Sequence, residues 1–231
     1  MDNQALSEKI DKIGDYVVQC TRNCPGVCND PIQGIIPRGL ILEIEHRENE
    51  KGSVIIGINP GPALPQEKES YLKAGRLYIN SKQLWEGTGS KKGIKNYPYY
   101  QHLRDFVDKL GRTGIILWSD LVKCESSEKR KMPPMQTKRI CSNLYLSKEI
   151  NVLPEEFPIF AIGRDAYESL SLMFINRIVI GIPNTSARGN QFNKIFARGE
   201  IDSTVKVKLQ EVLNGEERRA VWVDAENKAL V

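Results

Sequence analysis

Short apolar runs, rich in branched side chains, alternate along this chain with stretches of helical periodicity. Each run has the length and composition of a buried strand, and turn residues follow the first and the last of them. The runs lie at 53–58, 115–122, 158–162 and 177–182. Because strands that alternate with helices form crossover units, they predict a mainly parallel sheet covered on both faces. We therefore expect an α/β fold of three layers, α/β/α, around a central four-stranded sheet.

The remaining periodic segments predict the helices and one insertion. Apolar residues three and four positions apart indicate helices at 6–19, 100–110, 136–149 and 164–173. A charged helical pattern and a possible edge strand, AVWVD, follow residue 200. Residues 62–99 are too long for an ordinary connection, so they predict a partly helical insertion beside the strand ends. We treat residues 1–231 as one domain that carries this insertion.

Composition limits the classes of function. Hydrophobic residues make up 40% of the chain and charged residues 27%, so a sizeable core can form. No apolar run approaches the roughly 18 residues of a membrane span, and the first residues are polar, so we expect a cytoplasmic protein with no membrane partner. The net charge of +4 permits a polyanionic partner without requiring one. The sequence has neither a glycine-rich phosphate loop nor a zinc-deaminase pattern, so we expect no nucleotide cofactor.

Five cysteines fall into two groups along the chain. The early group is Cys20, Cys24 and Cys28, and the later pair is Cys124 and Cys141. We expect no disulfide framework, because the cytosol keeps thiols reduced. Four thiolates suit an iron–sulfur cluster or a tetrahedral zinc site, and the spacing does not separate the two. The alternative is five unrelated buried thiols.

Polar residues follow the first and the last of the predicted strands. Asn59 begins the turn Asn-Pro-Gly-Pro, in which proline would hold the Asn59 amide rigidly at the strand end. The second loop, 183–189, carries an amide, two hydroxyls, a cation and a glycine. Because the carboxyl ends of parallel strands converge, the two loops together could bind a planar polar ligand or a phosphate. The alternative for each loop is an ordinary turn.

These loops resemble the active-site motifs of the uracil-DNA glycosylase superfamily. GINPG at 57–61 has the form of the first motif in the mismatch-specific and single-strand-selective branches, and PNTS at 183–186 takes the place of the second. Two further segments, SDLVKC at 119–124 and AIGRDAYESL at 161–170, are similar to segments of the iron–sulfur enzymes of archaea and thermophilic bacteria. The order and approximate spacing agree over residues 16–190, so the resemblance is closest to this iron–sulfur branch.

The resemblance implies a monofunctional DNA glycosylase, which hydrolyses the N-glycosidic bond of uracil, or of another deaminated or damaged base, flipped out of DNA. In such an enzyme Asn59 would orient the attacking water, and Asn184 would donate to the base as negative charge accumulates. The implied base-binding residues are Gly57, Ile58, Tyr71, Asp120 and Ser186. The implied DNA contacts are Lys123, Arg130 and Arg188. The alternatives to Tyr71 as the ring that stacks on the base are Tyr78, Tyr99 and Tyr100, and for every one of these tyrosines the other possibility is a place in the core.

The resemblance also implies a 4Fe–4S cluster, with zinc as the alternative occupant. The implied ligands are Cys20, Cys24, Cys124 and Cys141. Cys28 is a substitute for Cys20, because one residue is inserted here relative to the family's pattern. The cluster would tie the amino-terminal loop to the basic segment 124–141 and so position cations against DNA phosphates.

Asp120 departs from the family, which commonly has Asn at this position. A side-chain amide can accept from uracil N3–H and donate to O4, whereas an ionised Asp only accepts. Asp120 would therefore favour bases that present amino or imino hydrogens, unless burial raises its pKa. The structural alternative is that Asp120 pairs with Lys123 or caps a helix. Asp120 also supports an alternative function, a catalytically inactive DNA-binding protein that keeps the fold and the cluster. In either case we expect a monomer whose partner is DNA.

Overall fold

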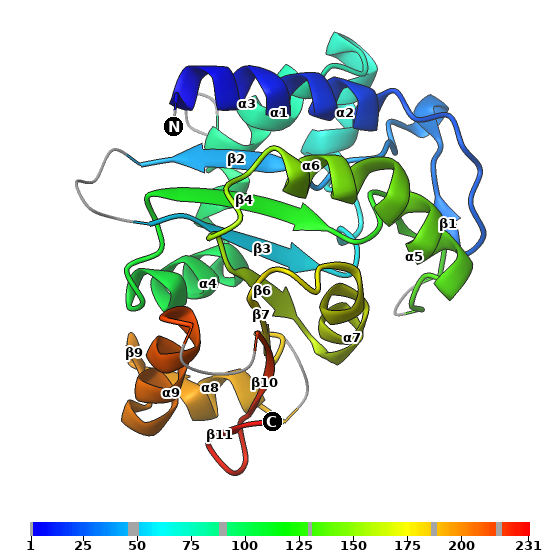
Figure 1. Cartoon of the computed structure of the whole chain (residues 1–231). Helices are drawn as coiled ribbons and strands as arrows, with labels where there is room; N and C mark the ends of the chain where they lie inside the picture. The colour runs from blue at the N-terminus through cyan, green and yellow to red at the C-terminus, as the bar shows by residue number, and fades with distance from the viewer. Residues whose placement is uncertain (1, 46–50, 88–91, 129–130, 186–188, 216–218) are drawn as a thin grey trace. The chain divides into compact units, whose positions relative to one another are not determined.

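The computed structural model describes residues 2–45, 51–87, 92–128, 131–185, 189–215 and 219–231. These residues form an α/β fold with a large mixed sheet of seven strands (Figure 1). The strand order is β11-β10-β7-β6-β3-β4-β2. In chain order the strands are β2 (Ile41–Ile44), β3 (Ser53–Gly57), β4 (Ile115–Asp120), β6 (Ile159–Ile162), β7 (Val179–Ile182), β10 (Ala220–Asp224) and β11 (Ala229–Leu230).

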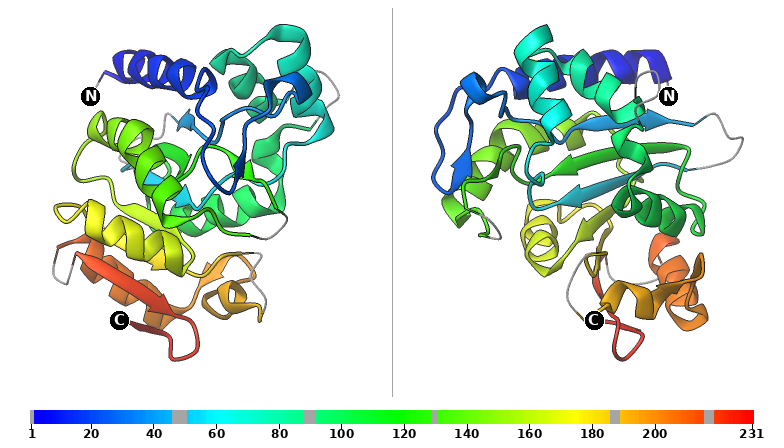
Figure 2. Two further views of the ribbon diagram at one scale, coloured as in Figure 1. Left: turned by 90° about the vertical axis from the view of Figure 1, so that its right-hand side faces the viewer. Right: turned by 180° about the vertical axis from the view of Figure 1, so that it is seen from behind.

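The four predicted strands are confirmed as β3, β4, β6 and β7, but the sheet has seven strands where four are expected. The neighbours β3, β6, β7 and β10 are joined in parallel, as crossover units require. In this register Ile159 lies opposite both Val54 and Val179. The possible edge strand is β10, which is paired on both sides because β11 adds an antiparallel edge (Figure 2).

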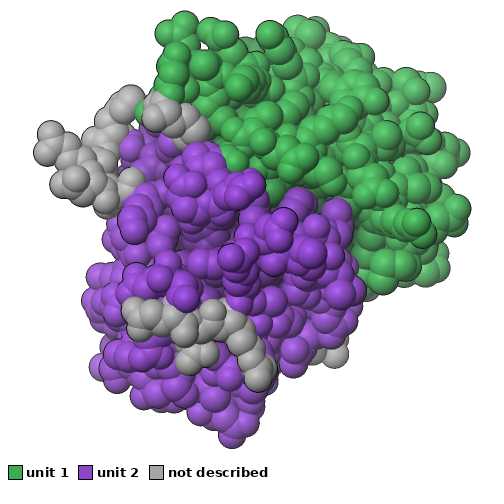
Figure 3. Space-filling model, viewed as in Figure 1, with its two compact units in different colours: residues 1–42, 58–95, 118–153 green, residues 43–57, 96–117, 154–231 purple. Residues whose placement is uncertain are grey.

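The chain divides into two compact units, each assembled from three segments (Figure 3). Unit 1 comprises residues 1–42, 58–95 and 118–153. Unit 2 comprises residues 43–57, 96–117 and 154–231. We describe each unit by itself.

Unit 1 contains the helices around the amino terminus and the middle of the chain. Its elements are α1 (Asn3–Val18), β1 (Val27–Cys28), a 3-10 turn (Pro31–Gln33), α2 (Pro65–Ala74), α3 (Tyr78–Glu86), β5 (Glu125–Ser126), α5 (Met135–Cys141), a π-helical turn (Ser142–Leu146) and α6 (Ser147–Asn151). Asp2 caps α1, because its side chain accepts hydrogen bonds from the backbone of Gln4 and Ala5. Gly14 lets α1 approach α3, since a Cβ there would lie 2.4 Å from the ring of Tyr78. The expected insertion is thus partly helical, through α2 and α3.

Unit 2 is built on an aromatic core next to the parallel strands. Its further elements are a 3-10 turn (Ile94–Asn96) at its border, α4 (Pro98–Asp108), α7 (Arg164–Met173), α8 (Gln191–Ile195), β8 (Phe196–Ala197), β9 (Glu200–Ile201) and α9 (Ser203–Leu213). The ring of Phe106 on α4 lies 6.3 Å from that of Phe160 and 5.7 Å from those of Phe192 and Phe196. These rings bury a large apolar area and hold α4 and α8 against β6.

Among the described residues, none of the helices is long and apolar enough to cross a membrane.

Candidate metal centre and adjoining loops

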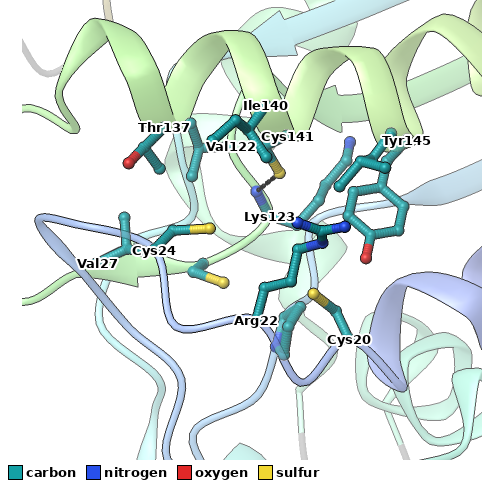
Figure 4. A pocket seen from close by; sticks show the side chains of 13 residues that line it. Cys20, Arg22, Cys24, Val27, Val122, Lys123, Thr137, Ile140, Cys141 and Tyr145 are labelled. Carbon is teal, nitrogen blue, oxygen red and sulfur yellow. Dashed lines mark hydrogen bonds between the residues drawn. The ribbon is translucent and has the colours of Figure 1, made fainter.

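Four of the five cysteines line one pocket in unit 1 (Figure 4). They are Cys20 and Cys24 in the loop after α1, Cys124 after β4, and Cys141 at the end of α5. The labelled thiols of Cys20, Cys24 and Cys141 point toward the same space in Figure 4. The structure therefore brings together the four residues that the resemblance implies as ligands.

Backbone pairing holds the two cysteine-bearing loops together. Strand β1 pairs with β5 in antiparallel fashion, with Val27 opposite Ser126 and Cys28 opposite Glu125. The Thr137 hydroxyl on α5 donates to the carbonyl of Pro25 at 2.8 Å. These contacts fix the geometry of the pocket walls without any contribution from a sulfur atom.

Cys20 is held in place by two neighbouring side chains, which bind its backbone carbonyl. Its carbonyl accepts a hydrogen bond from the Asn29 amide at 2.9 Å and another from the Arg76 guanidinium at 2.7 Å. Tyr145 lines the same pocket as the Cys20 thiol. Cys20 is thus fixed through its backbone, although it lies in a loop.

Burial dominates the electrostatics of the thiols. It raises the pKa of Cys124, and it raises the pKa of Cys141 to about 11, because the apolar pocket disfavours a thiolate. The neighbouring thiols act in the same direction. Lys123 opposes this shift at Cys141, both by its charge and because its backbone N–H donates to Cys141 Sγ at 3.2 Å. Such thiols become thiolates readily when a bound cationic centre compensates their charge.

Cys28 lies outside this pocket. Burial again raises the pKa of its thiol, but the next causes are the carboxylates of Glu125 and Asp30 and not another cysteine. The arrangement therefore favours Cys20 over Cys28 as the fourth ligand. Within the part of the chain that the structure describes, no group of three or more His, Cys, Asp or Glu side chains is placed so that it could hold a metal ion.

Asn59 lies beside this pocket, in the same unit. It follows β3, and its Nδ2 donates to Ser126 Oγ at 3.2 Å and to the carbonyl of Cys124 at 3.4 Å. The preceding Ile58 carbonyl accepts from the backbone N–H of Val122 at 2.9 Å. The half-buried Asn59 amide is thus tied to the loop that carries a predicted ligand.

A buried arginine fixes the rest of this loop. Arg38 pairs with Glu125 at 3.0 Å and with Glu67 at 3.3 Å, and it donates to the carbonyl of Gly61. Glu125 also accepts from the backbone N–H of Ala63 at 2.6 Å. This cluster is not predictable from sequence spacing, because its charges are far apart in the chain. The available signal was a lone arginine in an apolar segment, IIPRGLIL.

Replacing this arginine is expected to destabilise the protein. In Arg38→Met two buried carboxylates lose their common cation, which costs about 3–5 kcal/mol for a buried pair. Urea unfolding followed by circular dichroism measures the change. The control is Lys194→Met, which removes a solvent-exposed partner of Glu226 and is expected to cost at most about 1 kcal/mol. Equal losses of stability in the two variants would contradict the pairing of Arg38 with two buried carboxylates.

The prediction that Lys123 contacts DNA is wrong. The Lys123 side chain has no exposed surface, and its ammonium pairs with the equally buried carboxylate of Glu149 at 2.8 Å. It also donates to the backbone carbonyl of Asp120 at 2.9 Å. Among the described residues the Lys123 ammonium thus contacts the backbone of Asp120, and its ion pair is with Glu149, in contrast to the alternative that Asp120 pairs with Lys123.

Asp120 is half-buried at the end of β4. Burial raises its pKa to about 7, although Lys123 and Arg38 oppose the shift. Its Oδ2 lies 2.5 Å from the position that a Cβ on Gly39 would occupy, and Gly39 has a φ of +88°. Glycine at position 39 is therefore needed both for the backbone conformation and for the space that Asp120 fills.

Tyr71 lies in the core. Only 5% of it is exposed, and its hydroxyl is hydrogen-bonded to Ser81 Oγ at 2.7 Å. Tyr78 is equally buried, while Tyr99 and Tyr100 are half-buried on α4, with ring centroids 5.0 Å apart. The core alternative thus describes Tyr71, so as folded its ring is not open to a base.

Two of the predicted site residues belong to unit 2, and three lie outside the described residues. Asn184 follows β7 in unit 2 and is half-buried, and Gly57 ends β3 in the same unit. Ser186, Arg188 and Arg130 lie outside the described residues. A common cavity for Asn59 and Asn184 remains a prediction.

Neither a protein-family model nor a curated protein matches this sequence.

Proposed function

We propose that this protein is a DNA glycosylase that hydrolyses the N-glycosidic bond of uracil, or of another deaminated base, in base-excision repair. The observation that supports the proposal is the pocket lined by Cys20, Cys24, Cys124 and Cys141. These are the residues that the resemblance to iron–sulfur glycosylases selects from the sequence. The Asn59 loop adjoins the same pocket through the carbonyl of Cys124.

The four-thiol pocket suits a 4Fe–4S cluster. Cys20, Cys24, Cys124 and Cys141 would hold it, and the same four thiolates are the ligand set of a structural zinc site. When bound, the cluster supplies covalent links between the amino-terminal loop and the segment after β4. Apolar residues line the pocket together with Arg22 and Thr137, and the Lys123 N–H donates to Cys141 Sγ.

The catalytic chemistry would come from the strand-end loops. A base must leave the stack before its glycosidic bond is accessible, and it departs as an anion while the sugar becomes cationic. Because Nδ2 of Asn59 donates inside the protein, its Oδ1 is the atom that would hold the attacking water. The amide of Asn184 would donate to the departing base. Asp120, at the end of β4, would read the base edge, and its raised pKa means that near neutrality it is partly protonated and can both donate and accept.

Asn59→Ala tests the assignment. We expect base release to fall by roughly 10²-fold or more, because the water would lose its orienting group. The assay measures release from oligonucleotides that contain uracil, hypoxanthine, xanthine or 5-modified pyrimidines. Asn176→Ala, at an exposed position in the turn before β7, is the matched control and should keep the parent rate.

One observation favours the second candidate, a DNA-binding protein without catalysis. Tyr71, the first choice for the ring that stacks on a flipped base, is buried in the core. This candidate predicts DNA binding that weakens steeply with salt, and no release of any base in the panel. A metal-loaded parent protein that binds DNA but leaves the whole panel intact would replace the first proposal with the second.

A further inference from the structure

Lys123 has an unusual environment for a lysine beside a basic segment. All of its side chain is buried. Its ammonium donates to Ser119 Oγ at 2.5 Å, to the Asp120 carbonyl at 2.9 Å and to Glu149 Oε2 at 2.8 Å. An ammonium group has three N–H donors, so each of them has an acceptor inside the protein.

The backbone of Lys123 contacts two other parts of the site. Its N–H donates to Cys141 Sγ at 3.2 Å, and its carbonyl accepts from the N–H of Arg38 at 2.7 Å. Arg38 in turn binds the Gly61 carbonyl in the Asn59 loop. One residue therefore touches a predicted ligand, the strand end at Asp120 and the segment that clamps the Asn59 loop.

Stability alone does not account for this ion pair. Two charges removed from water lose much of their hydration, and well-packed apolar residues in their place are often as stable or more stable. The second carboxylate oxygen of Glu149, Oε1, is also buried without a hydrogen-bond partner among the described residues, which adds to the cost. A role in placing its neighbours explains why the pair is arranged as it is.

We propose that Lys123 is a positioning residue, which holds the Cys141 thiol, the Asp120 strand end and the Asn59 loop in one fixed arrangement. The part of this inference that concerns base selectivity rests on the proposed function. The part that concerns the order of the loops does not. Loss of the Lys123 ammonium should therefore loosen residues 58–64 and change which base is preferred.

The test uses a double substitution, Lys123→Met with Glu149→Met. Lys123→Met alone leaves Glu149 as a buried, unpaired carboxylate and is expected to fold poorly. The double variant removes both charges and keeps side chains of similar length, so it should fold. Its matched control is Lys109→Met with Glu200→Met, which removes an ion pair of similar length, 2.9 Å, on the surface of unit 2.

Two measurements decide the question. In the double variant, hydrogen exchange of the backbone amides in residues 58–64, followed by mass spectrometry, should be about tenfold faster or more. The reason is the loss of the charge-assisted hydrogen bond from the Lys123 ammonium to the Asp120 carbonyl at the end of β4. Exchange in α9 should match that of the parent. The ratio of kcat/KM for uracil to that for hypoxanthine should also change by about tenfold, and the control pair should change neither quantity.

The outcomes separate the two proposals. A folded double variant with parental exchange over 58–64 overturns the positioning role, and so does a double variant that does not fold, because the pair is then needed for stability. If the parent protein releases no base, the proposed function fails, and hydrogen exchange alone decides the role of Lys123.

Discussion

Replacing Cys20, Cys24, Cys124 or Cys141 singly by Ser is expected to abolish stable binding of iron and sulfide, whereas Cys28→Ser leaves it intact. Each of the four thiols lines the shared pocket, and Cys28 does not. A hydroxyl is a poor substitute for a thiolate at a cluster iron, so the loss of one ligand opens the site. Iron and acid-labile sulfide per chain, with the visible absorption spectrum, measure the result.

Loss of the bound metal should also lower the melting temperature of the protein. Binding energy at a site that exists only in the folded chain adds to the free energy of folding. For a chain of this length 1 kcal/mol corresponds to about 2–4 °C in melting temperature, so we expect a fall on the order of 10 °C in the four Ser variants. Cys28→Ser is the internal control. A Cys20→Ser protein with full iron content would show that Cys28, and not Cys20, is the fourth ligand. A colourless parent protein with one zinc per chain would show that the site binds zinc and not an iron–sulfur cluster.

Asp120→Asn is expected to change the pH dependence of both stability and base preference. Burial raises the pKa of Asp120 from 3.8 to about 7 in the folded protein. The folded state therefore binds more protons than the unfolded state between these values, and the parent loses stability as the pH rises from about 4 to 7. The full penalty, at most about 4 kcal/mol, applies above pH 7 and is absent below pH 4. Asn does not titrate, so the variant should escape this loss.

Urea unfolding of parent and variant at pH 4 and pH 8 measures the effect. The two proteins should be similarly stable at pH 4, and the variant should be the more stable one at pH 8. The control is the exposed Asp105→Asn on α4, which should differ from the parent by no more than about 0.5 kcal/mol at either pH. A difference for Asp120→Asn that is the same at both pH values would show that Asp120 does not titrate in this range.

The same substitution tests base reading under the proposed function. A protonated Asp120 can donate to uracil O4, whereas the ionised form repels it. Uracil release by the parent should therefore decline as the pH rises through about 7, and release by Asp120→Asn should not show this decline. If uracil release by the two proteins depended on pH in the same way, Asp120 would not be the residue that reads the base.

The sequence predicted the elements whose signal is local. Strands β3, β6 and β7 are buried on both faces, so they appear as unbroken apolar runs. Strands β2 and β11 were missed because they are short and mostly half-buried, and such segments carry no periodic signal. The grouping of the four thiols was also predictable, although only through a resemblance that supplied the pairing of distant segments.

Long-range electrostatics could not be predicted in the same way. Lys123 was assigned to DNA because basic residues follow it, but its acceptor Glu149 lies on a later helix, and nothing in a single sequence links the two. The ion pairs of Arg38 with Glu67 and Glu125 join three segments that are far apart in the chain, so a single sequence does not predict them either. The resemblance implies Tyr71 as a base-binding residue, but a sequence pattern cannot distinguish a ring that faces a cavity from one that faces the core.

The ladder between β1 and β5 has a consequence for the maturation of the protein. Because main-chain hydrogen bonds and the Thr137–Pro25 contact hold the two loops together, we expect that the chain can fold before the proposed cluster is bound. Iron and sulfide would then enter a pocket that is already formed. In a cell with little iron, the folded protein without its cluster would accumulate and would not be degraded. The supply of the inorganic centre, and not the rate of synthesis, would then limit how much mature protein a cell contains.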